Sequence, residues 1–175
     1  FQDSLKTASA NTVPYSAVQL QGRDIYIRES CHACHSQQVR PLLAEVKRYG
    51  PYSRAGEFVY DRPFMWGSKR TGPDLHRIGG KYSDIWHRIH LIKPRSVVND
   101  SIMPAYPWLE DEPASAAGDI QKKMQVLKTL GHPYSEQEIE AAPSMLDGLT
   151  EMDALIAYLQ VLGTSAETSE EQGHH

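Results

Sequence analysis

Two thiols and an imidazole lie within five consecutive residues of this chain. Cys31 and Cys34 are separated by two residues, and His35 follows directly. Thiols at this spacing can add to the two vinyl groups on one edge of a porphyrin, and the histidine that follows is then carried under the ring, where its imidazole can bind iron. The pattern therefore predicts one covalently attached haem c, with His35 as an axial ligand of the iron.

The same residues allow two other kinds of site. With only two cysteines in the chain, a structural zinc site would need two histidines as well, and His87 and His90 form an H-x-x-H pair that could supply them. Such a site would leave His35 without a role. A thioredoxin-type dithiol would follow a buried strand, whereas residues 19–30, ahead of the motif, have the pattern of a helix. Covalent haem is the favoured interpretation.

A methionine thioether is a soft ligand suited to the second axial position of a haem iron. Met103 is flanked by Pro104 and lies close to Pro107, and these prolines hold the stretch extended or turned. The other methionines lie in an aromatic-rich loop, in two predicted helices and in a second loop: Met65, Met124, Met152 and Met145. Most methionines fill gaps in a core, and Met145 is the strongest alternative ligand. We predict that Met103 binds the iron.

Length and composition fit one soluble, globular domain. Of the 175 residues 40% are hydrophobic, the mean hydropathy is negative, and no stretch approaches the roughly 18 consecutive apolar residues of a membrane helix. Because haem c is normally attached outside the cytoplasm, we expect a targeting or anchoring segment to precede residue 1. The closing Gly-His-His resembles a purification tag.

The charge is distributed unevenly along the chain. Residues 1–100 carry a net charge of +6 and residues 101–175 a net charge of −10. Two interpretations stay open. The charges could belong to ordinary solvated faces, or the basic part could face haem propionates or a negative partner while the acidic part steers a basic one. We expect no nucleic-acid partner.

Apolar periodicity and capping residues predict a mainly α-helical domain over residues 15–163. The predicted helices cover residues 16–30, 42–48, 83–92 and 114–130, a short segment that starts at 135, and residues 150–162. Residues 1–14 have the composition of a linker and residues 164–175 that of a disordered tail. The apolar face of the helix at 83–92 is expected to consist of Ile85, Trp86, Ile89 and Ile92.

Residues 36–70 lack a long periodic pattern and are punctuated by proline and glycine. A short strand is predicted at residues 57–60. The stretch is rich in Tyr, Phe, Trp and Arg, and a loop of this length inside a compact domain is usually functional. It is expected either to cover one edge of the haem or to dock a partner, because aromatic residues and Arg are favoured at interfaces.

These features resemble a class I cytochrome c. The resemblance is carried by the haem motif, a Gly-Pro turn, a Met-Pro pair and residues of the first and last helices: Gly22, Tyr26, Gly72, Pro73, Leu75, Met103 and Tyr158. It implies a fold in which the first and last helices cross at Gly22, near Tyr158. It also implies that the carbonyl of Pro73 accepts a hydrogen bond from His35 and orients the imidazole.

A closer resemblance extends from about Gly22 to Leu109. The matching stretches include Cys-x-x-Cys-His-Ser-Gln, Gly-Glu-Phe-Val-Tyr-Asp at 56–61, Trp-Gly-Ser-Lys-Arg-Thr-Gly-Pro-Asp-Leu at 66–75 and Met-Pro-Ala-Tyr-Pro-Trp-Leu at 103–109. They are similar to the mono-haem, membrane-anchored, FixO-like subunit of cbb3-type cytochrome c oxidases. The long insertion between the haem motif and the Gly-Pro turn is specific to that subunit. The membrane helix of that family is not part of this sequence.

The resemblance implies an electron carrier on the periplasmic side of the bacterial inner membrane, which has no catalytic residues of its own. Electrons would come from a di-haem subunit or a soluble cytochrome and pass to the catalytic haem-copper subunit. The alternatives are a free-standing soluble cytochrome c shuttle and a haem sensor or peroxidase with an open sixth site. Candidate partners of the haem propionates and ring are Arg40, Lys69, Arg70, Tyr82, Trp86 and Arg88.

Overall fold

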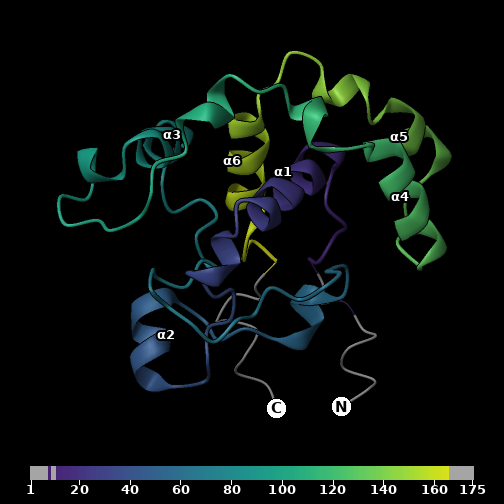
Figure 1. Ribbon diagram of the computed structural model, residues 1–175. Helices are drawn as coiled ribbons and strands as arrows, with labels where there is room; N and C mark the ends of the chain where they lie inside the picture. The colour runs from purple at the N-terminus through teal and green to yellow at the C-terminus, as the bar shows by residue number, and fades with distance from the viewer. Residues whose placement is uncertain (1–7, 9–10, 166–175) are drawn as a thin grey trace, which may run out of the picture. The chain divides into compact units, whose positions relative to one another are not determined.

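The computed structural model of the chain describes residue 8 and residues 11–165. In this part the structure is helical and holds no strand, which confirms the predicted fold class. Its α-helices are α1 (Ala17–Arg28), α2 (Leu43–Tyr49), α3 (Asp84–Ile92), α4 (Ile120–Thr129), α5 (Glu136–Ala141) and α6 (Glu151–Val161) (Figure 1). The predicted linker at 1–14 and tail at 164–175 lie largely outside the described residues.

The described chain forms two compact units. The first consists mainly of residues 32–79, with residues 162–165 beside them, and contains α2. The second consists of residues 14–31 and 80–161 and contains the other five helices. The haem motif begins at the end of one segment of the second unit and continues into the first.

In the second unit, α1 and α6 pack side by side (Figure 1). Ser16 and Gln19 form a capping box that starts α1. A Cβ at Gly22 would stand 2.9 Å from Tyr158 Cβ and closer still to the backbone of Ala154, so the glycine allows the two helices to approach closely. The crossing of the first and last helices at Gly22, near Tyr158, is confirmed.

A buried ion pair also joins these two helices. Glu151, at the start of α6, is buried, and Arg28 at the end of α1 donates to its carboxylate from both terminal nitrogens, one at 2.6 Å. The side chain of Arg28 is itself 44% exposed. The pair is therefore asymmetric: water can solvate the cation but not the carboxylate.

This asymmetry predicts unequal effects of removing the two partners. Arg28→Gln should lower the free energy of unfolding by about 3 kcal/mol, because it leaves a buried carboxylate without its counter-ion. Glu151→Gln should cost less, since the exposed guanidinium keeps water and Glu29 as partners. Urea denaturation of the two variants measures the difference. Equal losses would contradict the asymmetry.

Two sequence predictions of local structure were wrong. The strand expected at 57–60 is absent, and a 3-10 helix runs over Ala55–Phe58, capped by Glu57 on the backbone N–H of Arg54. The single helix expected at 114–130 is divided at Gly118, whose φ of 134° ends a 3-10 turn before Asp119 caps α4. Local capping chemistry decided both cases over apolar pattern.

The apolar residues of α3 do not form its buried face. Ser83 caps this helix as expected, but the buried residues are His87 and Leu91, while Ile85 is 70% exposed and Ile89 is also exposed. The side that carries His87 and Leu91 faces the rest of its unit, where α3 packs on α6. The isoleucines therefore form an apolar surface that the described part of this unit does not cover.

In the first unit, the short helix α2 buries a charged side chain and exposes apolar ones. Its only buried residue is Glu45, whereas Leu43 is 72% exposed and Leu42, its N-cap residue, is 52% exposed. The apolar core of this unit lies elsewhere, where Phe58 contacts the rings of Phe64, Trp66 and His76 with centroids 4.5–6.1 Å apart.

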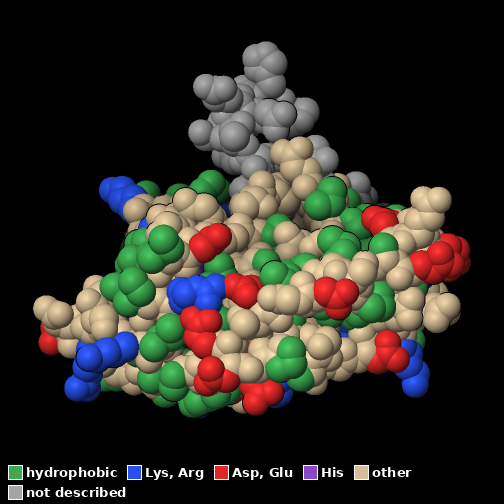
Figure 2. Space-filling model, turned by 90° about the horizontal axis from the view of Figure 1, so that it is seen from above, with side chains coloured by type: hydrophobic (Ala, Val, Ile, Leu, Met, Phe, Trp, Pro, Cys, Tyr) green, Lys and Arg blue, Asp and Glu red, His purple; other side chains and the backbone are tan. Residues whose placement is uncertain are grey.

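Charged side chains are mixed with apolar ones on the surface. On the face that Figure 2 shows, acidic side chains are spread among hydrophobic and other side chains rather than gathered at one place, and basic side chains lie between them. This face has the character of an ordinary solvated surface.

Candidate haem site

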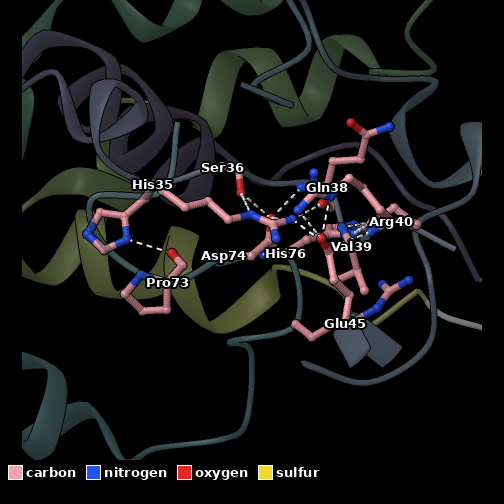
Figure 3. A network of polar contacts seen from close by, with 12 residues as sticks. His35, Ser36, Gln38, Val39, Arg40, Glu45, Pro73, Asp74 and His76 are labelled. Atoms are coloured by element: carbon pink, nitrogen blue, oxygen red, sulfur yellow. Dashed lines mark hydrogen bonds and ion pairs between the residues drawn. The ribbon is translucent and has the colours of Figure 1, made fainter. Parts of the chain in front are cut away.

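His35 is held by a backbone carbonyl. Its Nδ1 lies 2.8 Å from the carbonyl oxygen of Pro73 (Figure 3). A carbonyl oxygen only accepts, so Nδ1 must carry the hydrogen and donate. The lone pair of the imidazole then lies on Nε2, which is the tautomer that an iron ligand requires.

Gly72 places the Gly-Pro turn directly against this ring. A Cβ at Gly72 would stand 2.7 Å from both ring nitrogens of His35 and closer still to the carbon between them. Burial lowers the pKa of His35, while the hydrogen bond to Pro73 and the charge of Asp74 oppose that shift. The turn therefore fixes the imidazole, and burial favours its neutral form.

Backbone hydrogen bonds join the turn to the haem motif. The N–H of Gly72 donates to the carbonyl of Cys34 at 3.0 Å, and that of Leu75 donates to the carbonyl of Ser36 at 2.9 Å. These bonds lie on either side of the His35–Pro73 contact. They hold the histidine and its acceptor in register.

The cysteines follow the end of α1. Ser30 has a φ of 58°, a left-handed conformation that ends the helix, and its N–H donates to the carbonyl of Ile27 at 3.0 Å. A 3-10 turn over Cys31–Ala33 follows. Cys31 is half-buried and Cys34 is exposed. Neither thiol is enclosed in a core, as addition to a porphyrin requires.

Two buried ring nitrogens of the first unit lack a hydrogen-bond partner within the protein. They are His32 Nδ1, within the motif, and Trp66 Nε1, in the aromatic-rich loop. An unpartnered buried donor costs about 1–3 kcal/mol, and an indole nitrogen can only donate. A haem propionate would supply the acceptor. Sequence reasoning placed Trp66 in the aromatic loop but did not list it as a propionate partner.

The donor set therefore fits a covalent haem. It offers two accessible thiols, an imidazole with its lone pair on Nε2, and a buried indole N–H that a propionate could accept from. Among the residues that the structure describes, no group of three or more His, Cys, Asp and Glu side chains could hold a metal ion. The zinc alternative gains no support.

Met103 lies in an extended stretch of the second unit. Its N–H donates to Ser101 Oγ at 3.2 Å, and two further bonds, Arg95 Nε to Ser101 O at 3.0 Å and Tyr106 N to Leu91 O at 2.8 Å, tie the stretch to the end of α3 and beyond. The thioether is half-buried. It is neither enclosed in a core nor fully in solvent, as expected of a ligand on the surface of a cofactor site.

The other methionines have different surroundings. Met124 and Met152 are fully buried among the helices of the second unit, and Met65 is buried in the first. Met145 is 49% exposed, in a short 3-10 turn. The sequence prediction that Met103 binds iron stays a prediction, and Met145 has the less suitable position.

Three of the candidate haem partners, Arg70, Tyr82 and Trp86, have partners within the protein. Arg70 binds Ser36, Gln38 and Glu45. Tyr82 and Trp86 stack on each other with ring centroids 4.0 Å apart. Two other candidates for the propionates, Arg40 and Arg88, are paired with carboxylates, and Lys69 is exposed.

The comparison with known families agrees with this site. The profile of the family described as cytochrome c oxidase, mono-haem subunit/FixO matches residues 1–148. The chain belongs to this FixO family. It is thus a mono-haem subunit of a cytochrome c oxidase, and the predicted cofactor, one haem, is confirmed. No curated protein matches the chain. None of the helices among the described residues of this FixO chain is both long and apolar enough to cross a membrane.

The first unit of this FixO chain contains a buried histidine, His76, whose environment disfavours protonation. His76 is buried, its Nδ1 is hydrogen-bonded with Ser53 Oγ, and its ring lies 4.5 Å from that of Phe58. Burial, with the charge of Arg77 adding to it, holds the pKa of His76 well below its usual value. The native state therefore keeps this imidazole neutral.

Protonation of His76 should destabilise the fold. Its contribution is fully present above pH 6.5, the usual histidine value, and is lost as the pH falls toward the lower folded pKa, by at most about 1.4 kcal/mol per pH unit. Urea denaturation at pH 7.5, 6.5 and 5.5 gives the free energy of unfolding at each pH. This free energy should fall less steeply with falling pH in His76→Gln than in the parent protein, because only the carboxylate titrations are common to both. An unchanged slope would show that His76 does not titrate in this window.

Proposed function

We propose that the chain relays electrons within a cbb3-type oxidase, from a di-haem subunit or a soluble cytochrome to the catalytic subunit. The observation that supports this most directly is the hydrogen bond from His35 Nδ1 to Pro73, which leaves the Nε2 lone pair for iron. The bound haem would supply an iron that gains and loses one electron. In this proposal the chain transfers electrons and makes no bond to a substrate.

The residues on both axial sides keep the ligands in place during electron transfer. Pro73 and Gly72 fix the His35 imidazole, and Pro104 and Pro107 restrict the backbone around Met103. Thioether ligation favours the ferrous state and raises the reduction potential. Ile85 and Ile89 are exposed on α3 and form an apolar surface of the second unit.

The absorption spectrum of the purified protein tests this assignment. A haem that stays attached under denaturing conditions, with a low-spin reduced spectrum and a sulfur-to-iron charge-transfer band, is expected. Met103→Ala should abolish that band and let carbon monoxide bind. Met145→Ala is the matched control and should leave the spectrum unchanged.

Other spectra would lead to other functions. A high-spin native protein that binds carbon monoxide readily would favour the sensor or peroxidase, because its sixth site would be open. Loss of the charge-transfer band in Met145→Ala and not in Met103→Ala would show that Met145, and not Met103, binds the iron. Zinc without haem would contradict the assignment of the whole motif.

We also propose that the first unit contacts another oxidase subunit through a basic and apolar surface. All the carboxylates among its described residues are buried: Glu45, Glu57, Asp61 and Asp74. Its exposed charges are basic: Arg40, Lys47, Arg48, Arg62 and Lys69. Lys47 and Arg48 are on α2, where Leu43 and the N-cap residue Leu42 are also exposed. This combination fits a partner surface that has carboxylates around an apolar centre.

Charge reversal on α2 tests this contact. Lys47→Glu with Arg48→Glu should weaken binding to the purified remaining subunits about tenfold at low salt, and the effect should shrink as salt rises. Lys122→Glu, an exposed substitution on α4, is the control. Equal effects at both places would indicate general charge attraction. Binding to anionic vesicles instead of subunits would point to a lipid surface.

This subunit is proposed to lie on the periplasmic side of the bacterial inner membrane, anchored by a segment ahead of residue 1. The proposal rests on the resemblance and on the need to attach haem c outside the cytoplasm. Fractionation of cells that express the full-length gene, with a protease added to intact spheroplasts, measures the side on which the haem domain lies. Protection from the protease would place it in the cytoplasm.

A further inference from the structure

Asp74 lies at the centre of a hydrogen-bonded network behind His35 (Figure 3). Its carboxylate is fully buried. It accepts three hydrogen bonds, from Ser36 Oγ at 2.6 Å and from the backbone N–H groups of Gln38 at 2.7 Å and His76 at 2.9 Å. Ser36 follows His35 in the chain, and Asp74 follows Pro73. One carboxylate therefore ties together the two segments that orient the imidazole.

Arg70 is the counter-ion of this carboxylate. Its guanidinium lies 3.6 Å from Asp74 Oδ2, and its Nε donates to Ser36 Oγ at 2.7 Å. The same guanidinium donates to Glu45 at 2.8 Å and contacts the ring of Tyr49. The guanidinium of Arg70 is thus held in place by all of these contacts. Two opposite charges stand side by side in the segment that holds His35.

Fixed charges near an iron ligand act on the two oxidation states unequally. The ferric iron has one more positive charge than the ferrous iron, so a nearby carboxylate stabilises the ferric state and a nearby guanidinium stabilises the ferrous state. The effect is stronger in a buried site than in water. Asp74 and Arg70 would therefore shift a reduction potential in opposite directions.

We propose that Asp74 and Arg70 are positioning residues that set the reduction potential of the haem through His35, Asp74 lowering it and Arg70 raising it. The inference rests on the proposed function, since it takes His35 as an iron ligand. It adds a role for the buried pair behind that ligand, which holds the imidazole in place and balances its charge.

Redox titration of single variants of the haem-loaded protein tests the proposal. Asp74→Asn should raise the potential and Arg70→Gln should lower it, each changing the one-electron equilibrium by up to about tenfold, or about 59 mV. Arg70→Lys keeps the charge, and Ser36→Ala removes a hydrogen bond without a charge. Both should stay close to the parent protein.

A purely structural role predicts another pattern. If the network only supports the turn, Asp74→Asn and Arg70→Gln loosen it alike and shift the potential in the same direction or not at all, which would overturn the proposal. Should Arg70→Gln fail to fold, Asp74→Asn against Ser36→Ala decides the question, because equal shifts in these two contradict a charge effect. Glu57→Gln removes a buried carboxylate paired with Arg77 in the same unit, and a shift as large as that of Asp74→Asn would also overturn it.

The absorption spectrum distinguishes a failure of the proposed function from a failure of the role proposed for Asp74 and Arg70. A parent protein without a histidine-ligated, low-spin haem would contradict the proposed function itself. Variants that keep the low-spin spectrum but lack the opposite shifts would contradict only the role of the pair.

Discussion

Gly72→Ala should remove the axial histidine from its site. The added methyl would overlap the imidazole of His35, at 2.7 Å from both ring nitrogens, where ordinary contacts are 3.4 Å or more. The ring can only escape by rotating away, and that rotation breaks the 2.8 Å hydrogen bond to Pro73. We expect the low-spin spectrum to be lost in most of the protein and the yield of haem-bearing protein to fall several-fold. Absorption spectra and a haem-stain assay measure both.

The control for this prediction is another glycine of ordinary surroundings. Gly80 has a φ of 69° and nothing within 4 Å of its virtual Cβ, so Gly80→Ala should cost about 1 kcal/mol in stability for its backbone conformation and leave the spectrum intact. A normal spectrum in Gly72→Ala would show that the turn can move away from the ring without loss of ligation, contrary to the tight backbone register described above.

The parts of the site that are local in sequence were the predictable ones. The spacing of Cys31, Cys34 and His35 contains the attachment chemistry in five residues, and the Gly-Pro turn is recognisable by its composition. The network behind His35 was not predictable, because Arg70 and Glu45 are 25 residues apart and neither belongs to a periodic pattern. Arg70 was instead predicted as a candidate haem partner, the ordinary expectation for an arginine in a haem protein.

The fold shows the same division. The caps at Ser16, Ser83 and Ser135 gave the starts of three helices, because a side chain bonding its own first turn is a short-range signal. The apolar face of α3 was predicted from its periodicity, but the burial of His87 and Leu91 was not. Apolar pattern alone does not show which side of a helix packs on the rest of the protein.

Gly22→Ala should strongly destabilise the second unit. In an exposed helix this change is stabilising by about 1 kcal/mol. In α1 the new methyl would stand 2.5 Å from the backbone carbon of Ala154 and closer to its oxygen, so α1 and α6 must separate. Overpacking of this kind costs about 3 kcal/mol, or roughly 6–12 °C in melting temperature for a protein of this size. Thermal unfolding followed by circular dichroism measures it.

The obstacle to Gly22→Ala is backbone, and this gives a sharp second test. Because no side chain causes the main overlap, Ala154→Gly should not rescue Gly22→Ala, although it would rescue a clash between two methyl groups. Separation of the helices should also loosen the edge-on contact of Tyr26 with Tyr158, whose ring centroids are 5.5 Å apart, and near-ultraviolet circular dichroism would report that change. At Gly148 nothing lies within 4 Å of an added Cβ. Gly148→Ala should therefore lose only the stability that alanine's strain at a positive φ costs. Rescue by Ala154→Gly would mean that the two helices can slide past each other, and the close crossing would then not be what holds the second unit together.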